Sequence, residues 1–79
     1  SPPCAPAFMR IDFAKKVVVG QKRTTPIMHS DKSDQQLMLQ GVEMGLAWTI
    51  VIDTTDGAMM VSMVDSGGAY VLSGSCTPL

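Results

Sequence analysis

The apolar residues of this chain recur at every second position, and this period restricts what the chain can fold into. Within 46–53, Leu46, Trp48, Ile50 and Ile52 occupy alternate positions. A period of two indicates a β-strand with one buried face, whereas an amphipathic helix has a period of about 3.6 residues. The same pattern predicts seven strands along the chain: Phe8–Phe13, Lys16–Gly20, Thr24–His29, Gln35–Val42, Leu46–Asp53, Ala58–Val64 and Ala69–Ser75.

Short polar or Gly-containing segments separate these strands. Glu43-Met44-Gly45, Asp56-Gly57 and Asp65–Gly68 are typical of hairpin turns, and Ser30–Asp34 is also predicted to be a polar turn. About seven short antiparallel strands at this spacing favour an all-β meander, closed as a small barrel or folded into a sandwich. The 79 residues leave room for one domain, residues 1–79.

Several strands are apolar on both faces, as Val18, Val51, Met60 and Val71 show. A closed sheet, a sandwich or a dimer would bury the second face, so the chain is a candidate homo-oligomer. Hydrophobic residues make up 46% of the chain and its net charge is −1, which excludes a disordered chain. No apolar run approaches the ~18 residues of a membrane span, so none is expected.

The two cysteines, Cys4 and Cys76, lie near the two ends of the sequence. In so short a chain they are predicted to form a disulfide that ties the termini together; the alternative is two unrelated thiols. A disulfide implies an oxidising compartment, and therefore a periplasmic or secreted protein. The start at Ser1, without Met or an apolar leader, is typical of a mature form that has lost its signal peptide.

Charge is distributed unevenly, because all six basic residues lie in the first 32 positions. Four of them, Lys15, Lys16, Lys22 and Arg23, are candidate binding residues for an anionic partner such as a glycan, a lipid headgroup or an acidic protein. The alternative is a solvated hairpin whose charges protect exposed sheet edges from pairing. A slightly acidic chain with four aromatic residues does not suggest a nucleic-acid partner.

No motif for catalysis, metal binding or cofactor binding is present. His29 is the only histidine, and no nucleophile or acid accompanies it in a recognisable pattern. The pair Met28-His29 could begin a copper site, but the seven methionines are scattered and suit an adaptable core. We therefore expect no catalytic residues, no metal and no cofactor.

The chain resembles small exported bacterial β-domains of unknown function. The resemblance rests on Ile11-Asp12-Phe13, on Trp48–Asp53 followed by Asp56-Gly57-Ala58-Met59, and on the ending Gly74-Ser75-Cys76-Thr77. It covers most of the chain and implies a periplasmic or secreted β-domain without supplying an activity.

A weaker similarity is to the periplasmic C-type lysozyme inhibitors, which use a Ser-Gly loop to enter the lysozyme cleft. Ser66, Gly67 and Tyr70 match that loop, although Gly68 and Ala69 stand where a basic residue is expected. The alternative interpretation of this segment is a hairpin turn. We therefore expect a non-catalytic exported module that is structural or binds a protein or envelope component, with a lysozyme inhibitor-like protein as the alternative.

Overall fold

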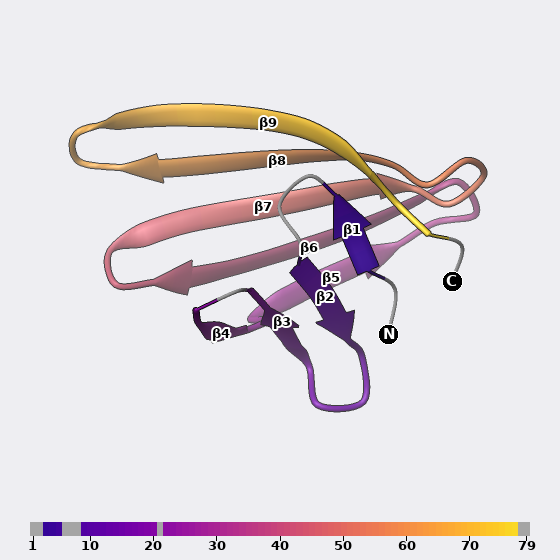
Figure 1. Ribbon diagram of the computed structural model, residues 1–79, viewed down its shortest axis with the longest axis horizontal. Coiled ribbons are helices and arrows are strands. Elements are labelled where there is room, and N and C mark those ends of the chain that lie inside the picture. The colour runs from indigo at the N-terminus through magenta and orange to yellow at the C-terminus, as the bar shows by residue number, and fades with distance from the viewer. Residues whose placement is uncertain (1–2, 6–8, 21, 78–79) are drawn as a thin grey trace.

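The computed structural model describes residues 3–5, 9–20 and 22–77. In these ranges the chain forms nine antiparallel strands and no helix (Figure 1). The strands are β1 (Pro3–Ala5), β2 (Met9–Asp12), β3 (Val17–Val19), β4 (Thr24–Pro26), β5 (His29–Lys32), β6 (Gln36–Glu43), β7 (Leu46–Asp53), β8 (Ala58–Asp65) and β9 (Gly68–Cys76). The predicted all-β meander is confirmed with nine strands rather than seven. Phe8, the first residue of one predicted strand, lies outside the described residues.

The two additional strands are β1 and β5, and neither has an alternating pattern. β1 is three residues long and lies in a Pro-rich segment. β5 has the sequence His-Ser-Asp-Lys, so the prediction of a polar turn over 30–34 was wrong for most of its length. β5 forms because it pairs with β6, from His29 opposite Gln40 to Lys32 opposite Leu37. These residues have little local preference for a strand, and the pairing with β6 is what makes them one.

One sheet contains all nine strands, in the order β4-β3-β2-β1-β9-β8-β7-β6-β5. Its two edge strands, β4 and β5, are separated in the chain by only Ile27 and Met28. The amide of Ile27 donates to Lys16 O at 2.8 Å, and the amide of Met28 donates to Gln40 O at 2.8 Å. The linker is therefore hydrogen-bonded near both edges of the sheet. The sheet curls into a half-barrel instead of forming a two-layer sandwich.

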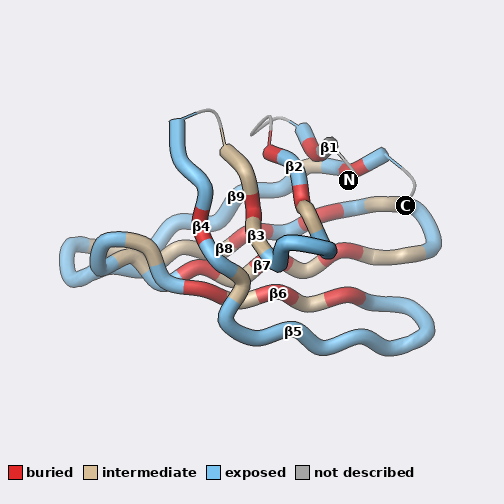
Figure 2. Tube along the Cα trace, turned by 90° about the horizontal axis from the view of Figure 1, so that it is seen from below, coloured by how far each residue is buried: buried red, intermediate tan, exposed pale blue. Residues whose placement is uncertain are grey.

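The core lies on the concave side of the curled sheet. Strands β2–β4 lie across the long strands β6–β8, and buried residues from the two groups face each other (Figure 2). As predicted, alternate residues of the long strands point inward; the buried set is Cys4, Met9, Ile11, Val18, Leu37, Leu39, Trp48, Ile50, Ile52, Met59, Val61 and Cys76. In β3 the buried residue is Val18, between half-buried Val17 and Val19. Phe13 leaves the buried face of Met9 and Ile11 because the chain turns after Asp12.

A disulfide joins Cys4 to Cys76 and confirms the predicted connection between the ends of the chain. The two residues are directly opposite each other in the β1–β9 pair, with their Cα atoms 3.9 Å apart, and both are buried. A structural disulfide of this kind is compatible with an exported protein. Within the described ranges, the structure has no helix of the length and hydropathy that a membrane span requires.

Candidate functional site

The four predicted basic binding residues do not gather in one place. Lys15 and Lys16 belong to the turn between β2 and β3, whereas Lys22 and Arg23 precede β4. Because β2, β3 and β4 are consecutive antiparallel strands, these two turns lie at opposite ends of β3. The charges therefore form two separate sites.

The β2–β3 turn is held by one hydrogen bond to a side chain and one between backbone groups. Asp12 accepts a hydrogen bond at Oδ1 from the amide of Lys15 at 3.0 Å, a side-chain contact that stabilises turns. Lys16 has a positive φ of 57° and accepts the amide of Ile27 at its carbonyl. These bonds place Lys16 beside the linker between β4 and β5.

A groove of about 530 Å³ opens beside this turn. We call it the lysine groove; its lining residues are Phe13, Lys16, Ile27, Met28, His29, Ser30, Lys32, Leu37 and Leu39. Leu37 and Leu39 are buried core residues, whereas Phe13 and Met28 are exposed at 43% and 70%. The groove is thus lined by both buried and exposed apolar side chains, and two lysines contribute to its lining.

Register explains how Lys32 reaches the lysine groove. Lys32 is opposite Leu37, so it shares the concave face of the sheet with this buried leucine. Asp31 is opposite Met38 and lies on the other face. Of the nine described residues that line the groove, none carries a carboxylate. Lys32 was not among the predicted binding residues, because residues 30–34 were expected to form a turn and nothing in their local pattern indicates the pairing with β6.

An apolar groove with ammonium groups in its lining suits a particular ligand chemistry. The hydrocarbon part of such a ligand would be stabilised by burial against Leu37, Leu39 and Ile27, and its negative charge would be attracted by Lys16 and Lys32. The volume lies within the range of small-molecule sites, about 300–1,000 Å³.

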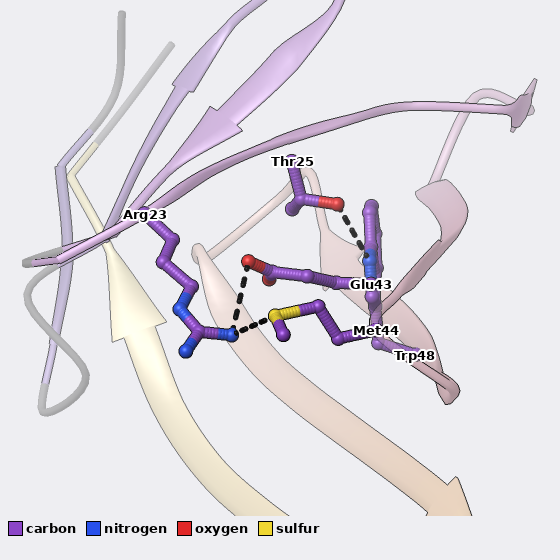
Figure 3. Close-up of polar contacts among 5 residues, drawn as sticks. All are labelled: Arg23, Thr25, Glu43, Met44 and Trp48. Carbon is purple, nitrogen blue, oxygen red and sulfur yellow. Dashed lines mark hydrogen bonds and ion pairs between the residues drawn. The ribbon is translucent and has the colours of Figure 1, made fainter.

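Arg23 joins two hairpin turns at the other end of β3 (Figure 3). Its Nη1 lies 3.8 Å from Glu43 Oε1 and donates to Met44 Sδ at 2.7 Å. Nearby, the indole Nε1 of Trp48 donates to Thr25 Oγ1 at 3.3 Å in a buried hydrogen bond. These contacts link the β3–β4 turn to the β6–β7 hairpin. The carboxylate of Glu43 also offsets part of the positive charge of Arg23.

Ser66, Gly67 and Tyr70, the residues matched to the lysozyme inhibitors, lie at one end of the β8–β9 hairpin. Ser66 and Gly67 are exposed in the two-residue turn between Asp65 and Gly68. The amide of Gly67 donates to Asp65 Oδ1 at 2.8 Å, which is the bond expected of a simple hairpin turn. Tyr70 is exposed on β9 in the same hairpin.

His29 and the acidic residues form no metal cluster in the described part of the chain. No group of three His, Cys, Asp or Glu side chains there could hold a metal ion.

The pKa of Asp53 is lowered chiefly by the hydroxyl of Thr55, which donates to its Oδ1 at 2.6 Å, and also by the Thr55 amide at 2.8 Å. This carboxylate organises the β7–β8 turn.

Comparisons with known proteins found no match to this chain. No family model matches it, and neither curated proteins nor solved structures give a match.

Proposed function

We propose that this chain is an exported, non-catalytic β-domain that binds an anionic amphiphile of the cell envelope in the lysine groove. The observation that supports this proposal is the position of Lys16 and Lys32 in the lining of a groove that contains buried Leu37 and Leu39. A fatty acid or an alkyl phosphate has the corresponding chemistry, with one anionic end and one hydrocarbon end.

The two lysines reach the groove from different elements. Lys16 belongs to the β2–β3 turn and Lys32 to β5, so a ligand anion between them would connect segments that are distant in the sheet. With no carboxylate among the described lining residues, neither lysine has a competing acidic partner in the groove. Exposed Phe13 and Met28 are apolar surface that a bound chain would cover.

The proposed location outside the cytoplasm rests on the Cys4–Cys76 disulfide, since such bonds persist in oxidising compartments. The resemblance to small exported β-domains supports the same location. The non-catalytic character rests on the sequence, which contains no recognisable pairing of a nucleophile with a base.

Isothermal titration calorimetry with dodecanoate and with dodecyl phosphate tests the proposal. The double variant Lys16→Glu/Lys32→Glu should bind at least about tenfold more weakly, because each contact of a charged donor contributes about 1.5–3 kcal/mol. Lys22→Glu, the same change at the other end of β3, should bind within about twofold of the wild type. Dodecanol, which has no charge, should bind more weakly than either anion.

The two anions distinguish the sources of the ligand, since dodecanoate represents a free fatty acid and dodecyl phosphate a phospholipid-like headgroup. Binding that is equal in the double variant and in Lys22→Glu contradicts the proposal. So does an absence of heat with both anions in the wild type.

A second candidate function is inhibition of a C-type lysozyme. It is favoured by the position of Ser66, Gly67 and Tyr70 in one exposed hairpin. If this candidate is correct, the wild type lowers lysozyme activity at micromolar concentration and Tyr70→Ala does not. Undiminished lysozyme activity with the wild type removes it.

A further inference from the structure

Met44 is the most exposed large hydrophobic residue in the described part of the chain. Its exposed fraction is 82%, compared with 70% for Met28, whereas Met9 and Met59 are buried in the core. Met44 and Gly45 form the two-residue turn between β6 and β7, with φ values of 49° and 83°. Such a turn favours Asn, Asp or Gly at its first position, so neither packing nor backbone conformation explains a methionine here.

The sulfur atom of Met44 lies beside a positive charge (Figure 3). Arg23 Nη1 donates to Met44 Sδ at 2.7 Å, and Glu43 Oε1 lies 3.8 Å from the same nitrogen. The distance to Glu43 exceeds that of a hydrogen bond, and a thioether is a weak acceptor. The guanidinium of Arg23 therefore has strong donors that are not fully used, next to an accessible sulfur atom.

Thioethers react with hydroperoxides to form sulfoxides. With hydrogen peroxide, a lone pair of sulfur attacks one oxygen, the S–O bond forms and the O–O bond breaks. The departing hydroxide takes the proton of the transferred oxygen and becomes water, so sulfur is oxidised and peroxide is reduced by the same electron pair. Negative charge develops on the departing oxygen, and a guanidinium beside the sulfur atom stabilises that charge. Sulfur has a second lone pair, so the hydrogen bond from Arg23 leaves one for the attack.

We propose that Met44 and Arg23 form an oxidation site, at which a hydroperoxide converts Met44 to its sulfoxide faster than any other methionine of the chain. The sulfoxide oxygen is a stronger acceptor than sulfur, and the guanidinium that contacts the sulfur atom is its donor. Oxidation then strengthens the link between the β3–β4 turn and the β6–β7 hairpin without disturbing the core. The modification is reversible, since methionine sulfoxide reductases restore the thioether.

Met28 provides a comparison within the same molecule. It is also exposed, so an oxidant in solution reaches both sulfur atoms. Lys16 and Lys32 line the groove beside Met28, but within the described ranges no side chain donates a hydrogen bond to its sulfur. A difference in oxidation rate between Met44 and Met28 therefore reports the effect of the guanidinium in contact with the sulfur.

The oxidation site is independent of the proposed ligand. Arg23 and the lysine groove lie at opposite ends of β3, and neither Arg23 nor Met44 lines the groove. The oxidation rates are measured without any ligand. Failure of one proposal therefore leaves the other unaffected.

Peptide mapping by mass spectrometry after timed exposure to hydrogen peroxide tests the site. In the wild type, Met44 should be oxidised at least about twice as fast as Met28. Arg23→Gln, which removes the charge, should lower the ratio of the two rates about threefold. Lys22→Gln, the same loss of charge at the exposed neighbouring position, should leave the ratio unchanged. Because both rates come from one molecule, a general loss of stability does not produce this pattern.

Glu43→Gln separates the sulfur contact from the ion pair. It removes the carboxylate near Arg23 but keeps the guanidinium beside Met44, so the rate ratio should not fall. NMR of the Arg23 side chain gives a second readout, because exchange of its N–H protons with water should become slower once Met44 is oxidised. In Met44→Leu, peroxide should leave that exchange unchanged.

Three results would overturn the proposal. The first is a wild type in which Met44 is oxidised no faster than Met28. The second is a rate ratio that is the same in Arg23→Gln as in the wild type, or that falls equally in Glu43→Gln. The third is exchange of the Arg23 side-chain protons that is unchanged or faster after oxidation, because the sulfoxide would then not be held by the guanidinium.

Discussion

The carbonyl oxygen of Cys76 occupies the space that a β carbon at Gly57 would need. The amide of Cys76 in turn donates to Gly57 O at 2.8 Å, and Gly57 has a positive φ of 80°. The β7–β8 turn is therefore in direct backbone contact with the disulfide-bonded residue of β9. Only glycine satisfies both the close approach and the backbone conformation.

Gly57→Ala should lower the free energy of unfolding by about 2–3 kcal/mol, because it adds a steric overlap to backbone strain. Gly45→Ala is the matched control, since Gly45 has a φ of 83° but no atom lies within 4 Å of the place that its β carbon would take. It should cost about 1 kcal/mol, the strain alone. Urea unfolding of the oxidised proteins, followed by Trp48 fluorescence, measures both. Equal losses in the two variants would show that the contact with Cys76 is unimportant.

Thr25→Val should lower the free energy of unfolding by about 1–3 kcal/mol, because it leaves the buried indole N–H of Trp48 without its acceptor. Thr24→Val, at the exposed neighbouring position of β4, should stay within about 0.5 kcal/mol of the wild type. Urea unfolding again measures both changes. A Thr25→Val protein as stable as Thr24→Val would contradict the role of this hydrogen bond.

Removal of the disulfide should lower the free energy of unfolding by about 4 kcal/mol on the chain-entropy account, because the two cysteines are separated by 72 residues. The double variant Cys4→Ser/Cys76→Ser provides the comparison by urea unfolding. In the wild type, alkylation after denaturation without reductant should add no mass, and reduction should expose two thiols. Two adducts without reductant would contradict the disulfide.

Acid should weaken the β7–β8 turn through Asp53. The two hydrogen bonds from Thr55 lower the pKa of this carboxyl in the folded chain. The stabilisation is therefore complete above the unfolded pKa, about 4, and is lost as the pH falls through the lower folded pKa. Thr55→Val should raise the pKa of Asp53 toward its ordinary value. Carboxyl carbon NMR titration measures the shift, and a midpoint in the wild type at or above that of the variant would contradict it.

The long hairpins could be predicted from the sequence because their signals are local. Alternation over Leu46–Asp53 indicates which residues share a face, and Asp56-Gly57 marks the following turn. Both predictions are confirmed, with Trp48, Ile50 and Ile52 buried. β5 could not be predicted in this way, since its four residues include no apolar side chain and depend on β6 for their pairing.

The candidate site was predicted only in part. Lys16 was identified from the concentration of basic residues, but the grouping with Lys22 and Arg23 depended on proximity in the sequence. The structure separates them to opposite ends of β3 and brings Lys32 to the groove instead. Distance along a strand meander is a poor guide to distance in space, because every antiparallel turn reverses direction.

The strand period, the turns at Gly45 and Gly57, and the two cysteines available for a disulfide all follow from the order of the amino acids. Strand neighbours do not: β1 meets β9, β5 pairs with β6, and one edge of β9 stays open among the described strands only because of how the chain folds. The difference arises because alternation is a property of consecutive residues. The choice of neighbouring strands depends instead on backbone hydrogen bonds and burial between segments distant in the chain.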